Sequence, residues 1–198
     1  MTMIMAKSDD AQNAYKLVRA LQKRFADKLS ALSAEIGEDK KFEEVTWLRD
    51  EGLHGGGSRF EARDESLFNT GSVNVSQVHY NELPDRNLQS ATAISTIIHP
   101  KNPHVPSVHI HISLTELKGN KSYWRVMADL NPSIQYEEDR VNFETALKGL
   151  AGETYKEGSA QGDKYFDIPA LSRTRGVSHF YLENYKTEDK QKDYDFAK

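Results

Sequence analysis

Histidine side chains are concentrated in one segment of this chain. Four of the seven histidines lie between residues 99 and 111, namely His99, His104, His109 and His111. A histidine titrates near neutral pH and is a common metal ligand, so such a cluster could transfer protons or hold a metal ion. The segment is therefore the first candidate for chemistry in this sequence.

Two extended runs are predicted to position these histidines. An apolar run over residues 93–98 ends at His99, and a proline-containing turn leads into a second run in which apolar and polar residues alternate. Successive side chains of a strand point to opposite faces, so His109 and His111 should share one face with Ser113. The pattern predicts two neighbouring strands with a polar, titratable face.

The composition limits the class of protein. The 198 residues contain no cysteine, which excludes disulfides, thiolate metal sites and a cysteine nucleophile. Lysine and arginine total 26 against 30 acidic residues, for a formal charge of -4, so nucleic-acid binding has little electrostatic support. We find no signal peptide and no apolar run that could span a bilayer. A soluble, cytoplasmic protein with a single domain is expected.

The remaining patterns predict an α+β fold. Apolar residues at helical spacing from Val18 to Ile36, after the capping residue Ser8, indicate a long first helix. Further strands are predicted over residues 45–48, 59–61, 72–80, 123–130 and 177–185. Later helices are predicted from Glu137 to Gly152, with Phe143, Leu147 and Leu150 at helical spacing, and in the charged tail from residue 186. Short links between strands favour a large, mostly antiparallel sheet flanked by helices.

Several of these segments resemble motifs of one enzyme family. The segment HPKNPHVPSVH ends at His109, GGGSRFEARDESLFNTGSVNVSQVH covers residues 55–79, and ADLNP covers residues 128–132. All three resemble motifs of the oxygen-dependent coproporphyrinogen III oxidases, and similar positions run from residue 42 to residue 185. The chain is identified as a short, divergent member of that family.

The resemblance implies an activity and a set of reactants. Enzymes of this family oxidatively decarboxylate two propionate groups of coproporphyrinogen III to vinyl groups, giving protoporphyrinogen IX in haem biosynthesis. Molecular oxygen is the co-substrate and no organic cofactor is used, while a divalent metal is described for part of the family. The resemblance therefore implies an oxidoreductase with a tetrapyrrole substrate, an α+β fold and a homodimeric assembly.

The resemblance also implies which residues bind the substrate. Ser95 matches a serine that contacts the substrate, and Arg175 matches the arginine of an Arg-Gly motif that could pair with a propionate. His111 and Ser113 stand where the family has an Asn-x-Arg motif. These four residues are the implied substrate-binding set.

Proton transfer and metal binding are implied at three further positions. His109 matches the family's proposed proton donor, which makes it the implied catalytic residue. His99 matches a histidine described as a metal ligand, and Glu144 replaces a later histidine of the same kind. The implied metal ligands are His99, His109 and Glu144.

Departures from the family pattern leave other functions open. Ser113 replaces an arginine that would hold a carboxylate, and residues 1–198 contain no counterpart of the family's carboxyl-terminal segment. One alternative is a catalytically degenerate relative that binds a tetrapyrrole or a protein partner. Another is a small metal-dependent hydrolase that uses the histidine cluster.

Overall fold

The computed structural model describes residues 2–36, 42–63 and 66–198. Within these residues, seven strands form one antiparallel sheet in the order β1-β2-β3-β4-β5-β6-β9. The strands are β1 (Glu43–Leu48), β2 (Gly55–Arg63), β3 (Phe68–His79), β4 (Leu88–Pro100), β5 (Ser107–Leu117), β6 (Lys121–Asn131) and β9 (Ser178–Tyr185). The predicted α+β fold with a large antiparallel sheet is confirmed.

Four α-helices and a small hairpin complete the described chain. The helices are α1 (Asp9–Glu35), α2 (Glu137–Ala151), α3 (Tyr155–Tyr165) and α4 (Lys190–Ala197). The short strands β7 (Asp167–Ile168) and β8 (Arg173–Thr174) pair with each other, and single 3-10 turns occur at η1 (Asp50–Gly52), η2 (Gly152–Thr154) and η3 (Pro169–Leu171). None of the described helices is long and apolar enough to cross a lipid bilayer.

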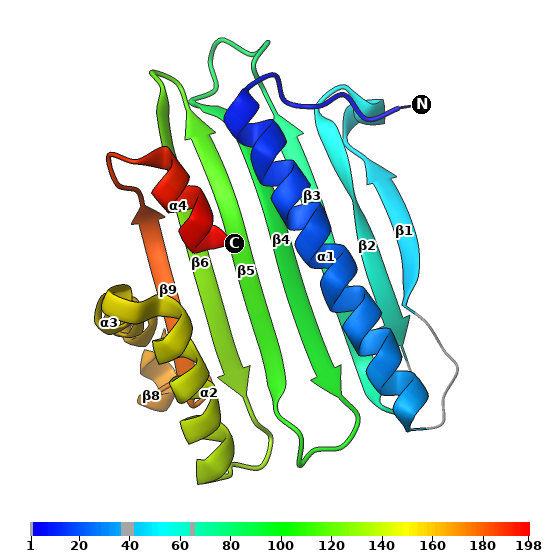
Figure 1. Cartoon of the computed structure of the whole chain (residues 1–198), viewed down its shortest axis with the longest axis vertical. Helices are drawn as coiled ribbons and strands as arrows, with labels where there is room; N and C mark the ends of the chain where they lie inside the picture. The colour runs from blue at the N-terminus through cyan, green and yellow to red at the C-terminus, as the bar shows by residue number, and fades with distance from the viewer. Residues whose placement is uncertain (1, 37–41, 64–65) are drawn as a thin grey trace.

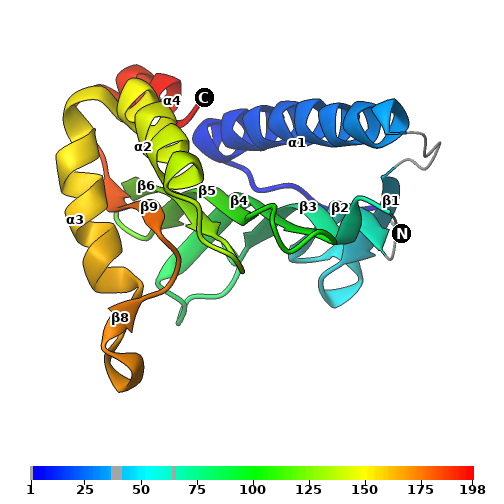
Figure 2. The same ribbon diagram turned by 90° about the horizontal axis from the view of Figure 1, so that it is seen from below.

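Alternating burial along the central strands gives the sheet two different faces. Val73, Val75 and Ile94 are buried and pack against Val18 of α1. Helix α1 lies across β3, β4 and β5, with α2 and α4 on the same side near β6 and β9 (Figure 1 and Figure 2). We call this side the covered face, and the side that carries none of these three helices the open face.

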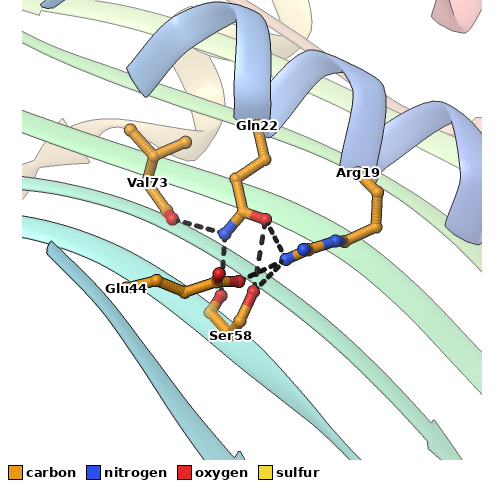
Figure 3. Close-up of polar contacts among 5 residues, drawn as sticks. All are labelled: Arg19, Gln22, Glu44, Ser58 and Val73. Carbon is orange, nitrogen blue, oxygen red and sulfur yellow. Dashed lines mark hydrogen bonds and ion pairs between the residues drawn. The ribbon is translucent and has the colours of Figure 1, made fainter. Parts of the chain in front are cut away.

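A buried polar residue connects α1 to the sheet (Figure 3). The Nε2 of Gln22 donates to the backbone oxygens of Ser58, at 2.9 Å, and Val73, at 2.8 Å. Its Oε1 accepts a hydrogen bond from Arg19, which also forms an ion pair with Glu44. Since a buried amide must be hydrogen-bonded to offset its desolvation, this network fixes α1 against β1, β2 and β3.

The helical stripe predicted from Val18 to Ile36 is only partly buried. Its last members, Leu32 and Ile36, are exposed, whereas the polar residues Gln22 and Ser33 are fully buried. The line of α1 that contacts the sheet therefore passes through polar residues, which hydrophobic periodicity could not identify.

The helices after β6 agree only in part with the sequence prediction. Helix α2 begins at Glu137 as predicted and ends before Gly152, but Leu150 is 83% exposed rather than buried. Helix α3 has no counterpart among the predicted elements. Its Gly158 lies so close to β9 that a Cβ atom there would be 2.1 Å from the Phe180 ring. Close helix–sheet packing at this edge thus depends on glycine.

Candidate functional site on the open face

The open face brings predicted site residues together from neighbouring strands. In the ladder, His111 of β5 lies directly across from Ser95 of β4 on one side and Met127 of β6 on the other. His109 lies across from Asp129 on the same face. The shared face predicted for His109 and His111 is confirmed, because the neighbouring residues of β5 pack on the covered face.

Arg175 joins this group from the loop before β9. Its Nε and Nη2 both donate to Oδ2 of Asp129, at 2.9 and 2.6 Å, and Asn131 donates to the same oxygen at 2.7 Å. The guanidinium also lies 4.5 Å from the centre of the Phe166 ring. His109 Nδ1 is 4.0 Å from the shared carboxylate oxygen. Arg175, Asp129 and His109 therefore form one electrostatic group.

A pocket of about 160 Å³ adjoins Arg175. It is lined by Asn131, Pro132, Gln135, Ile168, Arg173, Arg175, Gly176 and Val177. Two arginines thus border a small concavity beside the pair of Arg175 and Asp129, which suits a small anionic group such as a carboxylate.

The implied metal ligands do not converge. The His99 ring lies 5.3 Å from the His109 ring, centroid to centroid, but Glu144 lies on α2, which packs against the covered face. There the Glu144 carboxylate binds Arg140 and Lys148, at 2.7 and 2.6 Å. Among the residues that the structure describes, no group of three histidine or acidic side chains could hold a metal ion. The residues present do not fit a divalent metal site that includes Glu144.

Both histidines of β5 are only partly exposed. Burial lowers the pKa of His109, and the charge of Arg175 lowers it further. Burial lowers the pKa of His111 to about 4, with a further contribution from Arg125. The Nε2 atoms of both rings, and Oδ1 of Asp129, are buried without a hydrogen-bond partner in the described part of the chain. Unpaired buried polar atoms are rare in folded proteins, so three of them in one place mark this region as a candidate site.

A second arginine–carboxylate pair lies further along β6. Arg125 is directly across from Ser113, and its Nε and Nη2 donate to the two oxygens of Glu183, at 2.8 and 2.7 Å. The Tyr181 hydroxyl donates to the same carboxylate, and the Tyr181 ring stacks on Tyr165 of α3 at 3.9 Å. Helix α3 thereby borders the open face at the β9 edge (Figure 2).

Sequence reasoning assigned no role to Asp129, Arg125 or Glu183. The sequence did indicate the face of Arg125 and Asp129, because both alternate with apolar residues along β6 and so belong to the polar face of that strand. Which strand lies beside β5 in the sheet, and hence which charges face the histidines, depends on the tertiary fold. Glu183 could not be found without the pairing of β6 with β9.

The fold and the face define an α+β protein whose candidate site lies on one side of an antiparallel sheet. The family model for coproporphyrinogen III oxidase matches residues 13–198. This chain therefore belongs to the coproporphyrinogen III oxidase family, as its motifs predicted.

Individual relatives agree with that assignment. The oxygen-dependent coproporphyrinogen-III oxidase of Prochlorococcus marinus (strain NATL1A) is 33% identical over 184 residues, which is 86% of this chain and 51% of the relative. The protein of the same name from Synechococcus sp. (strain CC9902) is 30% identical over 190 residues, or 89% of this chain and 51% of the relative. The chain thus spans about half the length of the curated relatives it matches.

Proposed function

We propose that this chain takes part in the oxygen-dependent oxidative decarboxylation of coproporphyrinogen, with the substrate bound on the open face. The observation that supports this most strongly is the grouping of His109, Asp129 and Arg175. A guanidinium with free N–H groups can bind a propionate carboxylate, and the neighbouring imidazole can exchange protons with the reacting group.

The open face also suits the rest of a tetrapyrrole. Ile97, which is 40% exposed, lies beside His109 in the ladder and offers apolar surface to the macrocycle. Ser95 and His111 lie two residues further along the same strands, on the same face, and supply polar contacts. A ligand with an apolar ring and acidic side chains would match both kinds of surface.

The decarboxylation requires the protein to bind a propionate carboxylate and to supply a proton. Each propionate, as –CH2CH2COO⁻, reacts with one O2 and one proton to give a vinyl group, CO2 and H2O2. The C–COO⁻ bond breaks, a C–H bond is lost, and oxygen accepts the electron pair. In this scheme Arg175 binds a substrate carboxylate and His109 supplies the proton to reduced oxygen. Because its pKa is lowered, His109 must take up that proton when the anionic substrate binds.

Aerobic turnover tests this proposal. Purified protein is mixed with coproporphyrinogen prepared under argon, air is admitted, and vinyl products are separated by chromatography. We expect product with the wild type, loss of product with His109→Gln, and retention with the control His104→Ala, whose side chain is exposed in a turn and contacts Tyr136. Product at the spontaneous background rate with the wild type would contradict an oxidase function.

A second candidate is a relative that binds a tetrapyrrole without turnover. It is favoured by Met127, which lies between His111 and Tyr181 on the open face, and by the engagement of Arg175 with Asp129. A large side chain in this row narrows the space above the histidines. Tight binding of coproporphyrin together with absent product would select this function over the first.

The family resemblance also leads us to propose a homodimer located in the cytoplasm. Sedimentation equilibrium of the purified chain tests the assembly, since a dimer has twice the mass given by the sequence. A monomer at all accessible concentrations would contradict it.

A further inference from the structure

Arg125 occupies a distinctive place on the open face. It lies directly across from Ser113 of β5, and its guanidinium pairs with Glu183 of β9 on the other side of β6. The bidentate pair with Glu183 holds the guanidinium in one orientation. A guanidinium held in this way is already organised for a planar anionic group.

The guanidinium retains binding capacity beyond Glu183. An arginine has five N–H donors, and Glu183 accepts from two of them, one on Nε and one on Nη2. The Arg125 side chain is 37% exposed. The N–H groups of Nη1 and Nη2 that Glu183 does not use can therefore donate to a further carboxylate, and Glu183 stays in place.

The backbone around this pair has a specialised geometry. The ladder between β6 and β9 is irregular here, because Val126 pairs with Leu182 and Trp124 pairs with Tyr185. Two residues of β9 thus oppose Arg125, and one of them, Asn184, has a φ of 58°, in the left-handed region. Such bulges redirect side chains and often adjoin functional sites.

The two arginine pairs are set at a defined separation. Arg125 and Asp129, which holds Arg175, are four residues apart on β6, or about 13 Å along an extended strand. On the adjacent strand, His109 lies opposite Asp129, and His111 lies opposite Met127, midway between Arg125 and Asp129. The open face thus offers one guanidinium beside His109, from Arg175, and a second beyond His111, from Arg125.

We infer that Arg125 is a second carboxylate-binding residue of the open face, which together with Arg175 selects ligands that carry two separated carboxylates. The inference rests on the proposed function, because a tetrapyrrole with propionates on different rings is a ligand of that class. Ser113 stands where the family has an arginine, and Arg125 on the neighbouring strand would supply the guanidinium in its place.

Fluorescence titration with coproporphyrin III, the stable oxidised macrocycle, tests this inference. We expect Arg125→Gln to weaken binding roughly 10- to 100-fold, as for loss of a charge-assisted hydrogen-bonded pair. Arg125→Lys should recover part of the loss, because it keeps the charge without the planar fork. The tetramethyl ester, which lacks carboxylates, should bind both proteins equally.

Two control variants separate ligand binding from structural support. Arg140→Gln removes an arginine that is 38% exposed and likewise paired with carboxylates, but lies on α2, and it should leave binding within twofold. Glu183→Gln breaks the same pair as Arg125→Gln yet keeps the guanidinium. A carboxylate-binding Arg125 predicts that Glu183→Gln, which keeps the cation, weakens binding much less than Arg125→Gln does. Equal weakening by Glu183→Gln and Arg125→Gln, or no effect of Arg125→Gln, would overturn the inference.

A wrong proposed function would give a different result from a wrong role for Arg125. If the wild type does not bind coproporphyrin, the tetrapyrrole function is contradicted, and Arg125 is examined by titrating propionate and following its Nε–H signal by NMR. A saturable shift of that signal, absent for Arg140, supports carboxylate binding at Arg125. No shift overturns it.

Discussion

Arg175 and Asp129 form a pair in which two guanidinium nitrogens donate to a single carboxylate oxygen, at 2.9 and 2.6 Å. Asp129 is fully buried, while the other carboxylate oxygen has no hydrogen-bond partner among the described residues. The carboxylate therefore depends on Arg175 for compensation of its charge. The Arg175 side chain itself stays 43% exposed.

Removal of Arg175 should destabilise the protein as well as weaken ligand binding. Arg175→Gln leaves the buried Asp129 carboxylate without its cation, and we expect a loss of about 2–4 kcal/mol in the free energy of unfolding, measured in urea. The double variant Arg175→Gln/Asp129→Asn should recover much of this loss, since neither charge then remains. Additive losses in the double variant would show that the two side chains do not interact.

The lowered pKa of His111 should make stability depend on pH. Its native pKa is about 4 against an ordinary value of 6.5, so the unfolded chain binds the proton more tightly. The stabilising contribution is complete above pH 6.5 and is lost as the pH falls toward 4, a change of about 3 kcal/mol. Denaturation curves of the wild type and His111→Gln between pH 7 and 5 should register about 2 kcal/mol of it. Parallel pH dependences of the two proteins would contradict burial of a neutral His111.

Two glycines in neighbouring helices should respond oppositely to the same substitution. Gly158→Ala places a Cβ atom 2.1 Å from the Phe180 ring, and we expect a loss of about 1–3 kcal/mol as α3 moves from β9. Gly149→Ala, in α2, meets no atom within 4 Å, and we expect a gain of about 0.5–1 kcal/mol from helix propensity. Thermal unfolding measures both variants. A tolerated Gly158→Ala would show that α3 is not closely packed.

Local sequence patterns predicted the elements whose side chains alternate cleanly. The period of two in β5 placed His109 and His111 on one face, because that strand has one apolar and one polar side. Helix α3 escaped prediction since Gly158 and Gly162 have low helix propensity, and its stability depends on packing against β9. Helix propensity does not include the stabilisation that α3 gains from packing against β9.

The candidate site could be predicted only strand by strand. Family motifs pointed to His109 and Arg175, but the buried partner Asp129 acquires its role from the pairing of β5 with β6. Glu144 shows the opposite case, because its helix packs on the covered face, where Arg140 and Lys148 bind its carboxylate. A match between sequences cannot distinguish a glutamate that binds a metal from a glutamate in a surface ion pair.

The most direct test of the proposed function is CO2 release from coproporphyrinogen labelled with 13C in its propionate carboxyl groups. In air, we expect the wild-type chain to release two labelled CO2 molecules for each divinyl product, and His109→Gln to release none above background. Release that is equal in the wild type and His109→Gln, or absent from both, would contradict decarboxylation on the open face.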